Sequence, residues 1–61
     1  MKLIDFIEVY SENDKLTVID TLERVVTNYD GKNSIDEEYN DYEVIKIEPL
    51  NYDETVVMID R

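Results

Sequence analysis

Cysteine, histidine and tryptophan are all missing from this 61-residue chain. Without cysteine, neither a disulfide nor a thiolate metal site can form. Without histidine, the chain lacks the commonest general base and the commonest ligand of transition metals. The only glycine is Gly31, so a glycine-rich phosphate loop is excluded as well. These absences count against catalysis and against a transition-metal centre.

Basic residues are also scarce, because six lysines and arginines stand against sixteen aspartates and glutamates. The formal net charge is −10 at pH 7. Nucleic acids and anionic membranes both require a basic surface, so direct binding to either is disfavoured. A basic protein partner is favoured instead, with fast and salt-sensitive association. The alternative is that the acidity only keeps a small, abundant protein in solution.

Long hydrophobic runs are absent too. Asp5 and Glu8 interrupt the opening MKLIDFIEVY, which therefore does not read as a secretory signal. No window approaches the roughly 20 apolar residues of a membrane span. We expect a single soluble domain over residues 1–61, located in the cytoplasm. A chain of this length buries only about 60 % of its unfolded surface, so we expect stability to be marginal or supported by self-association.

The first half of the chain predicts a helix followed by a β-hairpin. The helix is expected over residues 2–10, because apolar residues recur there at helical spacing. The β-branched run at 15–21 predicts a strand, and 24–29 predicts the returning strand. Leu22 and Glu23 fall at the turn between them, although neither is a typical turn residue. The apolar stripe of the helix comprises Leu3, Phe6, Ile7 and Tyr10.

The middle of the chain carries turn and helix-start signals. Asp30-Gly31 is the strongest local turn signal. Ser34 and Glu37 have the spacing of a capping box, in which each side chain accepts a hydrogen bond from the other residue's backbone amide. We therefore expect a second short helix over about 35–40, partly of 3₁₀ type.

The second half predicts another hairpin. Residues 42–48 (YEVIKIE) have the strongest strand pattern in the chain. Proline cannot donate a hydrogen bond to a strand ladder, so Pro49 is expected to end this strand. Residues 55–60 (TVVMID) then predict a last strand that pairs back on it.

This order of elements predicts an α+β two-layer domain. An antiparallel sheet of about four strands, arranged as two hairpins, would be packed by the N-terminal helix, with the second short helix between the hairpins. The predicted core comprises Leu3, Phe6, Ile7, Leu16, Val18, Val25, Ile35, Ile45, Ile47, Val57 and Ile59. The opposite sheet face would keep Ile19, Val26, Val44, Val56 and Met58. That face indicates a homodimer or partner surface, although isolated apolar residues on a sheet surface are also normal.

Acids and tyrosines gather where the second helix is expected. Duplex DNA carries one negative charge per about 1.7 Å of its axis, and closely spaced carboxylates on a rigid scaffold can present a comparable field. Tyrosine is enriched at protein interfaces. The competing interpretation is a solvated acidic helix whose tyrosines are half buried against the sheet. The predicted partner-binding residues are Asp36, Glu37, Glu38, Tyr39, Asp41 and Glu43.

Two other kinds of site are disfavoured. An EF-hand loop built around Gly31 would need an oxygen ligand at the position of Val26, so only loose cation binding stays open there. Ser11 and Ser34 have no histidine to activate them as nucleophiles. We expect no enzymatic activity, no cofactor and no dedicated metal site. The oxygen-bearing residues around the glycine are Asn28, Asp30, Asn33 and Asp36.

The layout resembles short proteins encoded by phages and other mobile elements of Gram-positive bacteria. The resemblance is carried by the opening MKLIDFIEVY, the KLTVID strand, the YDGK turn, the IDEEYNDYEVIKI segment and the TVVMID strand. Leu22-Glu23 departs from it, because such proteins tend to carry a glycine-containing turn there. Small acidic phage proteins often resemble inhibitors of host defence, anti-CRISPR proteins among them, and some of these imitate nucleic acid.

Three hypotheses of function follow. The first is a phage-type inhibitor that occupies the basic site of a host nucleic-acid-handling protein, such as a CRISPR effector, in the host cytoplasm. The second is a homo-oligomer that sequesters a small signalling ligand, which for an anion requires a pocket of cations. The third is a structural or accessory module without a specific ligand. The cations available for such a pocket are Lys15, Arg24, Lys32 and Lys46.

Overall fold

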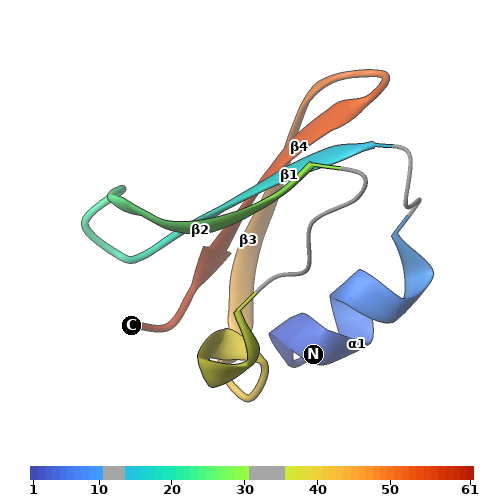
Figure 1. Cartoon of the computed structure of the whole chain (residues 1–61). Coiled ribbons are helices and arrows are strands. Elements are labelled where there is room, and N and C mark those ends of the chain that lie inside the picture. Colours follow the sequence, from blue (N-terminus) through green and yellow to red (C-terminus); the bar gives the residue numbers. More distant parts are fainter. Residues whose placement is uncertain (11–13, 31–35) are drawn as a thin grey trace.

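The computed structural model describes residues 1–10, 14–30 and 36–61. Figure 1 shows a helix and a short 3₁₀ turn on the same side of a four-stranded sheet. The predicted α+β two-layer arrangement is therefore confirmed. The elements are α1 (Leu3–Val9), β1 (Lys15–Ile19), β2 (Val25–Asp30), η1 (Glu37–Tyr39), β3 (Val44–Asn51) and β4 (Glu54–Ile59).

The sheet has the strand order β2-β1-β4-β3. Both predicted hairpins are present and antiparallel, but the central strands β1 and β4 run parallel. The sheet is therefore mixed, and the prediction of an antiparallel sheet was wrong. The reason is burial: Leu16, Val18, Val57 and Ile59 are all fully buried, so their two strands take the centre, where both neighbours shield them.

Helix α1 confirms the predicted N-terminal helix and its apolar stripe. Leu3 is fully buried, while Phe6, Ile7 and Tyr10 pack against the core. At the start of the helix, the backbone N–H of Lys2 donates to the Asp5 carboxylate at 3.2 Å. This bond holds the first turn, in which the helix dipole favours a negative charge.

The predicted second helix is replaced by the 3₁₀ turn η1 within the described residues. Its first expected residues, and Ser34 of the predicted capping box, lie outside those residues. The chain turns away immediately after Tyr39 because its next carbonyl groups are used elsewhere. The Leu3 amide of α1 donates to the carbonyl oxygen of Tyr42 at 2.9 Å, and the Ile4 amide donates to that of Asn40 at 3.1 Å. A longer second helix would need these same carbonyl oxygens as acceptors for its own backbone hydrogen bonds.

Pro49 does not end the third strand, which continues to Asn51. Strand β3 lies at the edge of the sheet, with β4 as its one neighbour. A proline without an N–H is tolerated on an edge strand, where a donor on the outer side has no ladder to join. The register with β4 also shifts between Pro49 and Asn51, so the proline sits at an irregularity.

The predicted burial of β2 and β3 was partly wrong. Val25 is 63 % exposed and Ile45 is 51 % exposed, and Ile47 is exposed as well, although all three were predicted to be buried. Val26 and Val44, predicted for the opposite face, pack against the core instead. Each hairpin contains a register shift that skips one residue, Val26 in β2 and Ile45 in β3. In β2 the shift places Val25 opposite Ile19, on the face away from the core. In β3 it leaves Ile45 unpaired, whereas Ile47 keeps the face of its buried partner Val57 and is exposed because β3 lies at the sheet edge.

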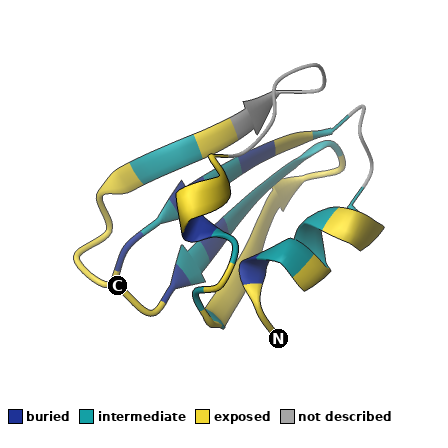
Figure 2. Cartoon of the chain, turned by 60° about the horizontal axis from the view of Figure 1, so that its bottom comes forward, coloured by how far each residue is buried: buried dark blue, intermediate teal, exposed yellow. Residues whose placement is uncertain are grey.

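The core lies between α1, η1 and the central strands. Figure 2 shows buried positions on β1, β4, α1 and η1, while β3 is exposed along most of its length. Ile35 of the predicted core lies outside the described residues. The buried hydrophobic residues are Leu3, Leu16, Val18, Tyr39, Val57 and Ile59.

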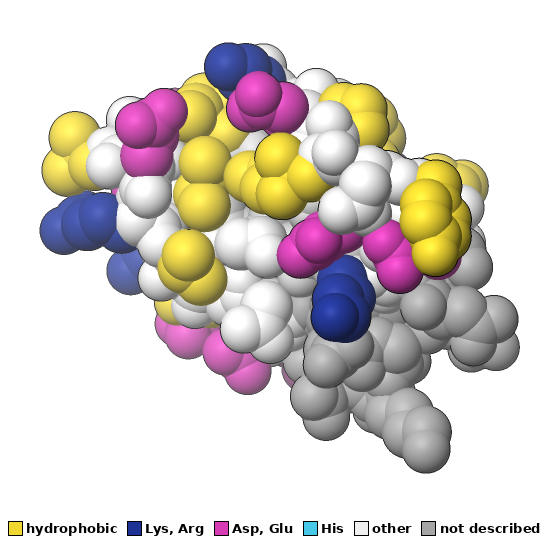
Figure 3. Space-filling model, turned by 90° about the horizontal axis from the view of Figure 1, so that it is seen from above, with side chains coloured by type: hydrophobic (Ala, Val, Ile, Leu, Met, Phe, Trp, Pro, Cys, Tyr) yellow, Lys and Arg dark blue, Asp and Glu magenta, His cyan; other side chains and the backbone are white. Residues whose placement is uncertain are grey.

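The sheet face away from α1 carries apolar side chains, as expected. Ile19 pairs with Met58 across the two central strands, and Val56 pairs with Thr17 in the next row. Seen from above, this side of the molecule shows hydrophobic side chains with acidic and basic ones between them (Figure 3). The homodimer suggested by this face stays a prediction.

The turn between β1 and β2 holds Glu23 in the left-handed region, at φ 63°. A side chain in that region costs roughly 1–2 kcal/mol, whereas glycine adopts it freely. We expect Glu23→Gly to raise the free energy of unfolding by about 1 kcal/mol and the melting temperature by about 4–8 °C. Glu23→Gln is the matched control, because it removes the charge and keeps the strain. Equal melting temperatures for the two variants would count against backbone strain.

Candidate functional site

The five acids predicted to bind a partner lie in residues 36–43, which we call the acidic segment. It comprises η1 and the turn that leads into β3, and it lies beside the start of α1 (Figure 1). All five of these acidic residues are exposed. They are Asp36, Glu37, Glu38, Asp41 and Glu43.

Tyr39, the sixth predicted residue, is placed differently. Only 8 % of it is exposed, and it belongs to the hydrophobic core. Its ring lies 6.2 Å from that of Tyr42, and the guanidinium of Arg61 lies 5.1 Å from its centroid. Tyr39 therefore anchors the acidic segment in the core, where most of its surface is closed to a partner.

Backbone hydrogen bonds fix the acidic segment to its neighbours. Besides the two bonds from α1, the Val44 amide donates to the Met1 carbonyl at 2.8 Å. The Asp60 amide donates to the Glu43 carbonyl at 2.9 Å, which joins the segment to the end of β4. The backbone that carries the carboxylates is thus held from two sides. Less conformational entropy is therefore lost when a partner binds.

Two of these acids have cationic neighbours. The terminal ammonium of Met1 lies 3.1 Å from the Glu43 carboxylate, and the Lys2 ammonium lies 3.9 Å from Asp41. All four groups are exposed, so these pairs contribute little to stability. Among the described residues, no ion pair involves Asp36, Glu37 or Glu38. In the described part of the chain, the cation that acts on the 36–38 end is Arg61, whose pKa Glu38 helps to raise.

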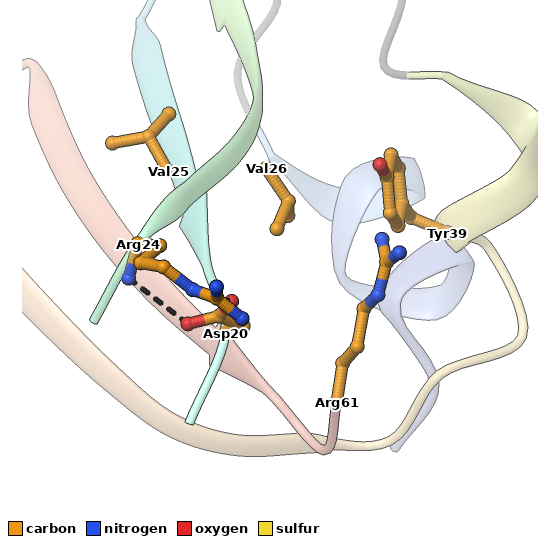
Figure 4. A pocket seen from close by; sticks show the side chains of 6 residues that line it. All are labelled: Asp20, Arg24, Val25, Val26, Tyr39 and Arg61. Atoms are coloured by element: carbon orange, nitrogen blue, oxygen red, sulfur yellow. Dashed lines mark hydrogen bonds and ion pairs between the residues drawn. The ribbon is translucent and has the colours of Figure 1, made fainter. Parts of the chain in front are cut away.

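A second constellation was missed by the sequence analysis. A pocket of about 390 Å³ opens beside η1, the β1–β2 turn and the chain's last residue (Figure 4). Arg24 had been considered only as one of four cations, and Arg61 had not been singled out. The two arginines come together only through the fold, so the sequence gives no local signal for the pocket. Its lining residues are Asp20, Arg24, Val25, Val26, Tyr39 and Arg61.

Asp20 is the one buried acid among the described residues, with 3 % of its surface exposed. Its Oδ1 accepts hydrogen bonds from the amides of Leu22 and Arg24, both at 2.9 Å. Its Oδ2 accepts a bond from the Arg24 Nε at 2.9 Å. The hydrogen bond from the Arg24 amide lowers the pKa of Asp20 most, and burial opposes that effect. The carboxylate therefore holds both the turn and the arginine.

This arrangement predicts a pH effect. The folded pKa of Asp20 lies below its usual 3.8, so the stability that it contributes is present above that value and is lost as the pH falls through the folded pKa. Asp20→Asn should lower the urea midpoint near neutral pH, because an amide nitrogen would face the Arg24 Nε. The difference from the native protein should shrink below pH 3.8. A difference that stays constant with pH would show that ionisation of Asp20 does not stabilise the fold.

Arg61 is fixed at both its backbone and its side chain. Its carbonyl oxygen accepts bonds from the Thr21 amide at 3.0 Å and the Thr21 hydroxyl at 2.7 Å. Its guanidinium lies over the rings of Tyr39 and Tyr42, at 5.1 and 6.0 Å. The Tyr39 hydroxyl raises the pKa of this guanidinium further above its usual value. Arg61 thus keeps its charge throughout the physiological range.

Within residues 1–10, 14–30 and 36–61, no cluster of three or more acids is arranged to hold a metal ion. Asn33 of the partial calcium pattern lies outside these residues. No helix in the described part of the chain has both the length and the apolar character needed to cross a membrane.

Comparison with known proteins gives no family. No protein-family model matches the chain, and neither the curated proteins nor the solved structures contain a significant match. The phage resemblance described above therefore stays a prediction, and the site must be interpreted from its own chemistry.

Proposed function

We propose that this chain is a non-enzymatic binding protein that presents its acidic segment to the basic, nucleic-acid-binding site of another protein. The supporting observation is that five exposed acids lie within residues 36–43, on a backbone that is hydrogen-bonded to α1 and to the end of β4. A flexible acidic tail would lose more conformational entropy on binding than this preorganised surface.

Electrostatics supports a basic partner. The chain carries a net charge of −10, and the carboxylates of the acidic segment add a local concentration of that charge. Oppositely charged surfaces accelerate association, and the effect falls steeply with ionic strength. A groove lined with lysines and arginines for nucleic acid would attract these acids in the same way. The protein would then block the groove by occupying it.

The phage resemblance suggests which class of partner to test. Under this proposal the partner is a host defence or nucleic-acid-handling protein, with CRISPR effectors as one candidate group. The resemblance contributes only this context. The proposed mode of binding rests on the acidic segment.

Capture from a bacterial lysate tests the proposal. Tagged protein is used as bait at low and high salt, beside the triple variant Asp36→Asn/Glu37→Gln/Glu38→Gln. A control triple variant, Glu8→Gln/Glu23→Gln/Glu48→Gln, removes the same charge at exposed positions outside the segment. The native protein and the control should recover a basic nucleic-acid-binding protein that elutes at high salt, and the segment variant should not. Equal recovery by both triple variants would contradict the proposal.

A further inference from the structure

The pocket beside η1 is cationic on a strongly acidic molecule. Its lining includes Arg24 and Arg61, two of the six basic residues of the chain, against the single acid Asp20. The Asp20 carboxylate is already satisfied by the bonds from the turn and from Arg24. Because Asp20 offsets one of the two arginines, the lining residues keep one net positive charge, and Glu38 lies close enough to Arg61 to raise the pKa of its guanidinium.

Arg24 is oriented with most of its donors free. Its Nε–H bonds to Asp20 at 2.9 Å, which fixes the direction of the guanidinium. A guanidinium has five N–H donors, so this bond leaves the two terminal amino groups available. The side chain is largely exposed on its outer side. An anion in the pocket would meet a cation whose position is already set.

Arg61 supplies a second oriented guanidinium. Its guanidinium carbon lies 5.1 Å from the centroid of the Tyr39 ring and 6.0 Å from that of Tyr42. The Tyr39 hydroxyl can engage at most a part of its five N–H donors, so others remain for a ligand. Figure 4 shows Arg24 and Arg61 entering from opposite sides of the pocket. Two guanidiniums that line one pocket suit an anion with several oxygen atoms.

The remaining walls are apolar. Val25, Val26 and the ring of Tyr39 line the space beside the arginines. The volume of about 390 Å³ falls within the range typical of small-molecule sites, which combine apolar walls with a few placed polar groups. A bare inorganic ion would leave these apolar walls in water. A ligand with an apolar or aromatic body would cover them.

We propose that this pocket binds a small phosphate monoester with an apolar or aromatic body. The phosphate group lies between Arg24 and Arg61 and accepts hydrogen bonds from both guanidiniums, and the body packs on Val26 and Tyr39. A phosphate is favoured over a carboxylate because its oxygens can accept bidentate bonds from both arginines at once. This site adjoins the acidic segment, which contributes Tyr39 to its wall, and the inference goes beyond the proposed function.

Titration with phenyl phosphate, followed by amide NMR shifts, tests the inference. Shifts are expected at Val25, Val26 and Tyr39, with inorganic phosphate binding about tenfold more weakly because it leaves the apolar walls uncovered. Arg24→Gln and Arg61→Gln should each weaken phenyl phosphate by about tenfold or more, the value of one charged hydrogen bond. Lys46→Gln, which removes an exposed charge on β3, is the control and should bind as the native protein does.

Three results would overturn this inference. The first is an absence of shifts at the pocket amides with millimolar phenyl phosphate. The second is unchanged affinity in the double variant Arg24→Gln/Arg61→Gln, whose folding the same spectra report. The third is equal affinity for phenyl phosphate and inorganic phosphate. The triple variant of the acidic segment should retain phenyl phosphate binding, so a failure of the proposed function and a failure of this site are distinguishable.

Discussion

Replacement of Tyr39 by alanine is expected to remove a third or more of the stability of the fold. Truncation of a buried large aromatic side chain typically costs about 3–5 kcal/mol. At about 0.05–0.15 kcal/mol per residue, the 61 residues amount to about 3–9 kcal/mol in total. Tyr39 is the only core residue in η1, so its loss also frees the acidic segment from the sheet. Urea unfolding followed by circular dichroism measures the change.

Tyr52 provides a matched control for this prediction. It is 96 % exposed, so Tyr52→Ala should change the free energy of unfolding by less than about 0.5 kcal/mol. Tyr39→Phe keeps the buried ring and should stay much closer to the native protein than Tyr39→Ala. A Tyr39→Ala variant as stable as Tyr52→Ala would mean that Tyr39 does not anchor the segment.

The second large effect concerns affinity for the captured partner. Neutralising Asp36, Glu37 and Glu38 together should weaken binding by about 100-fold, since three interfacial charges at about 1 kcal/mol each amount to about 3 kcal/mol. The dependence of the dissociation constant on salt should become shallower, because fewer ion pairs form. Isothermal titration at several salt concentrations measures both quantities.

Stability separates this effect from misfolding. These acids belong to exposed residues, and their removal relieves repulsion in a chain of charge −10, so the triple variant should melt at the same or a higher temperature. The control triple variant in residues 8, 23 and 48 should keep its affinity within a few-fold. Equal losses of affinity in both variants would assign the binding to overall charge and not to the acidic segment.

Local patterns were sufficient to predict most of the elements. The helical spacing of the first ten residues gave α1, because one apolar stripe must face a sheet in so short a helix. The alternation in β1 placed Leu16 and Val18 correctly in the core. The exposure of the five acids was also expected, since clustered charges are rarely buried.

Features that depend on distant parts of the chain were missed. The register shifts skip Val26 in β2 and Ile45 in β3, and alternation alone gives no sign of a skipped residue. The parallel contact of β1 with β4 joins strands that are far apart in sequence. Pro49 was taken as the end of a strand because the sequence does not reveal that β3 lies at an edge.

The pocket was missed for the same reason. Arg24 follows β1 by a few residues, whereas Arg61 follows β4, and the parallel pairing of those strands brings their ends together. The sequence pattern placed Asp20 within the strand predicted over residues 15–21 and gave it no further role. Its role in holding Arg24 becomes visible only from its burial and its three hydrogen bonds.

Competition with nucleic acid tests the central claim most directly. The captured partner is immobilised with this protein bound, and its nucleic acid, or a generic duplex of the same type, is then titrated in at constant ionic strength. The account predicts that nucleic acid releases the protein and that the two never bind together, because both occupy one basic site. A stable ternary complex of partner, nucleic acid and this protein would contradict it.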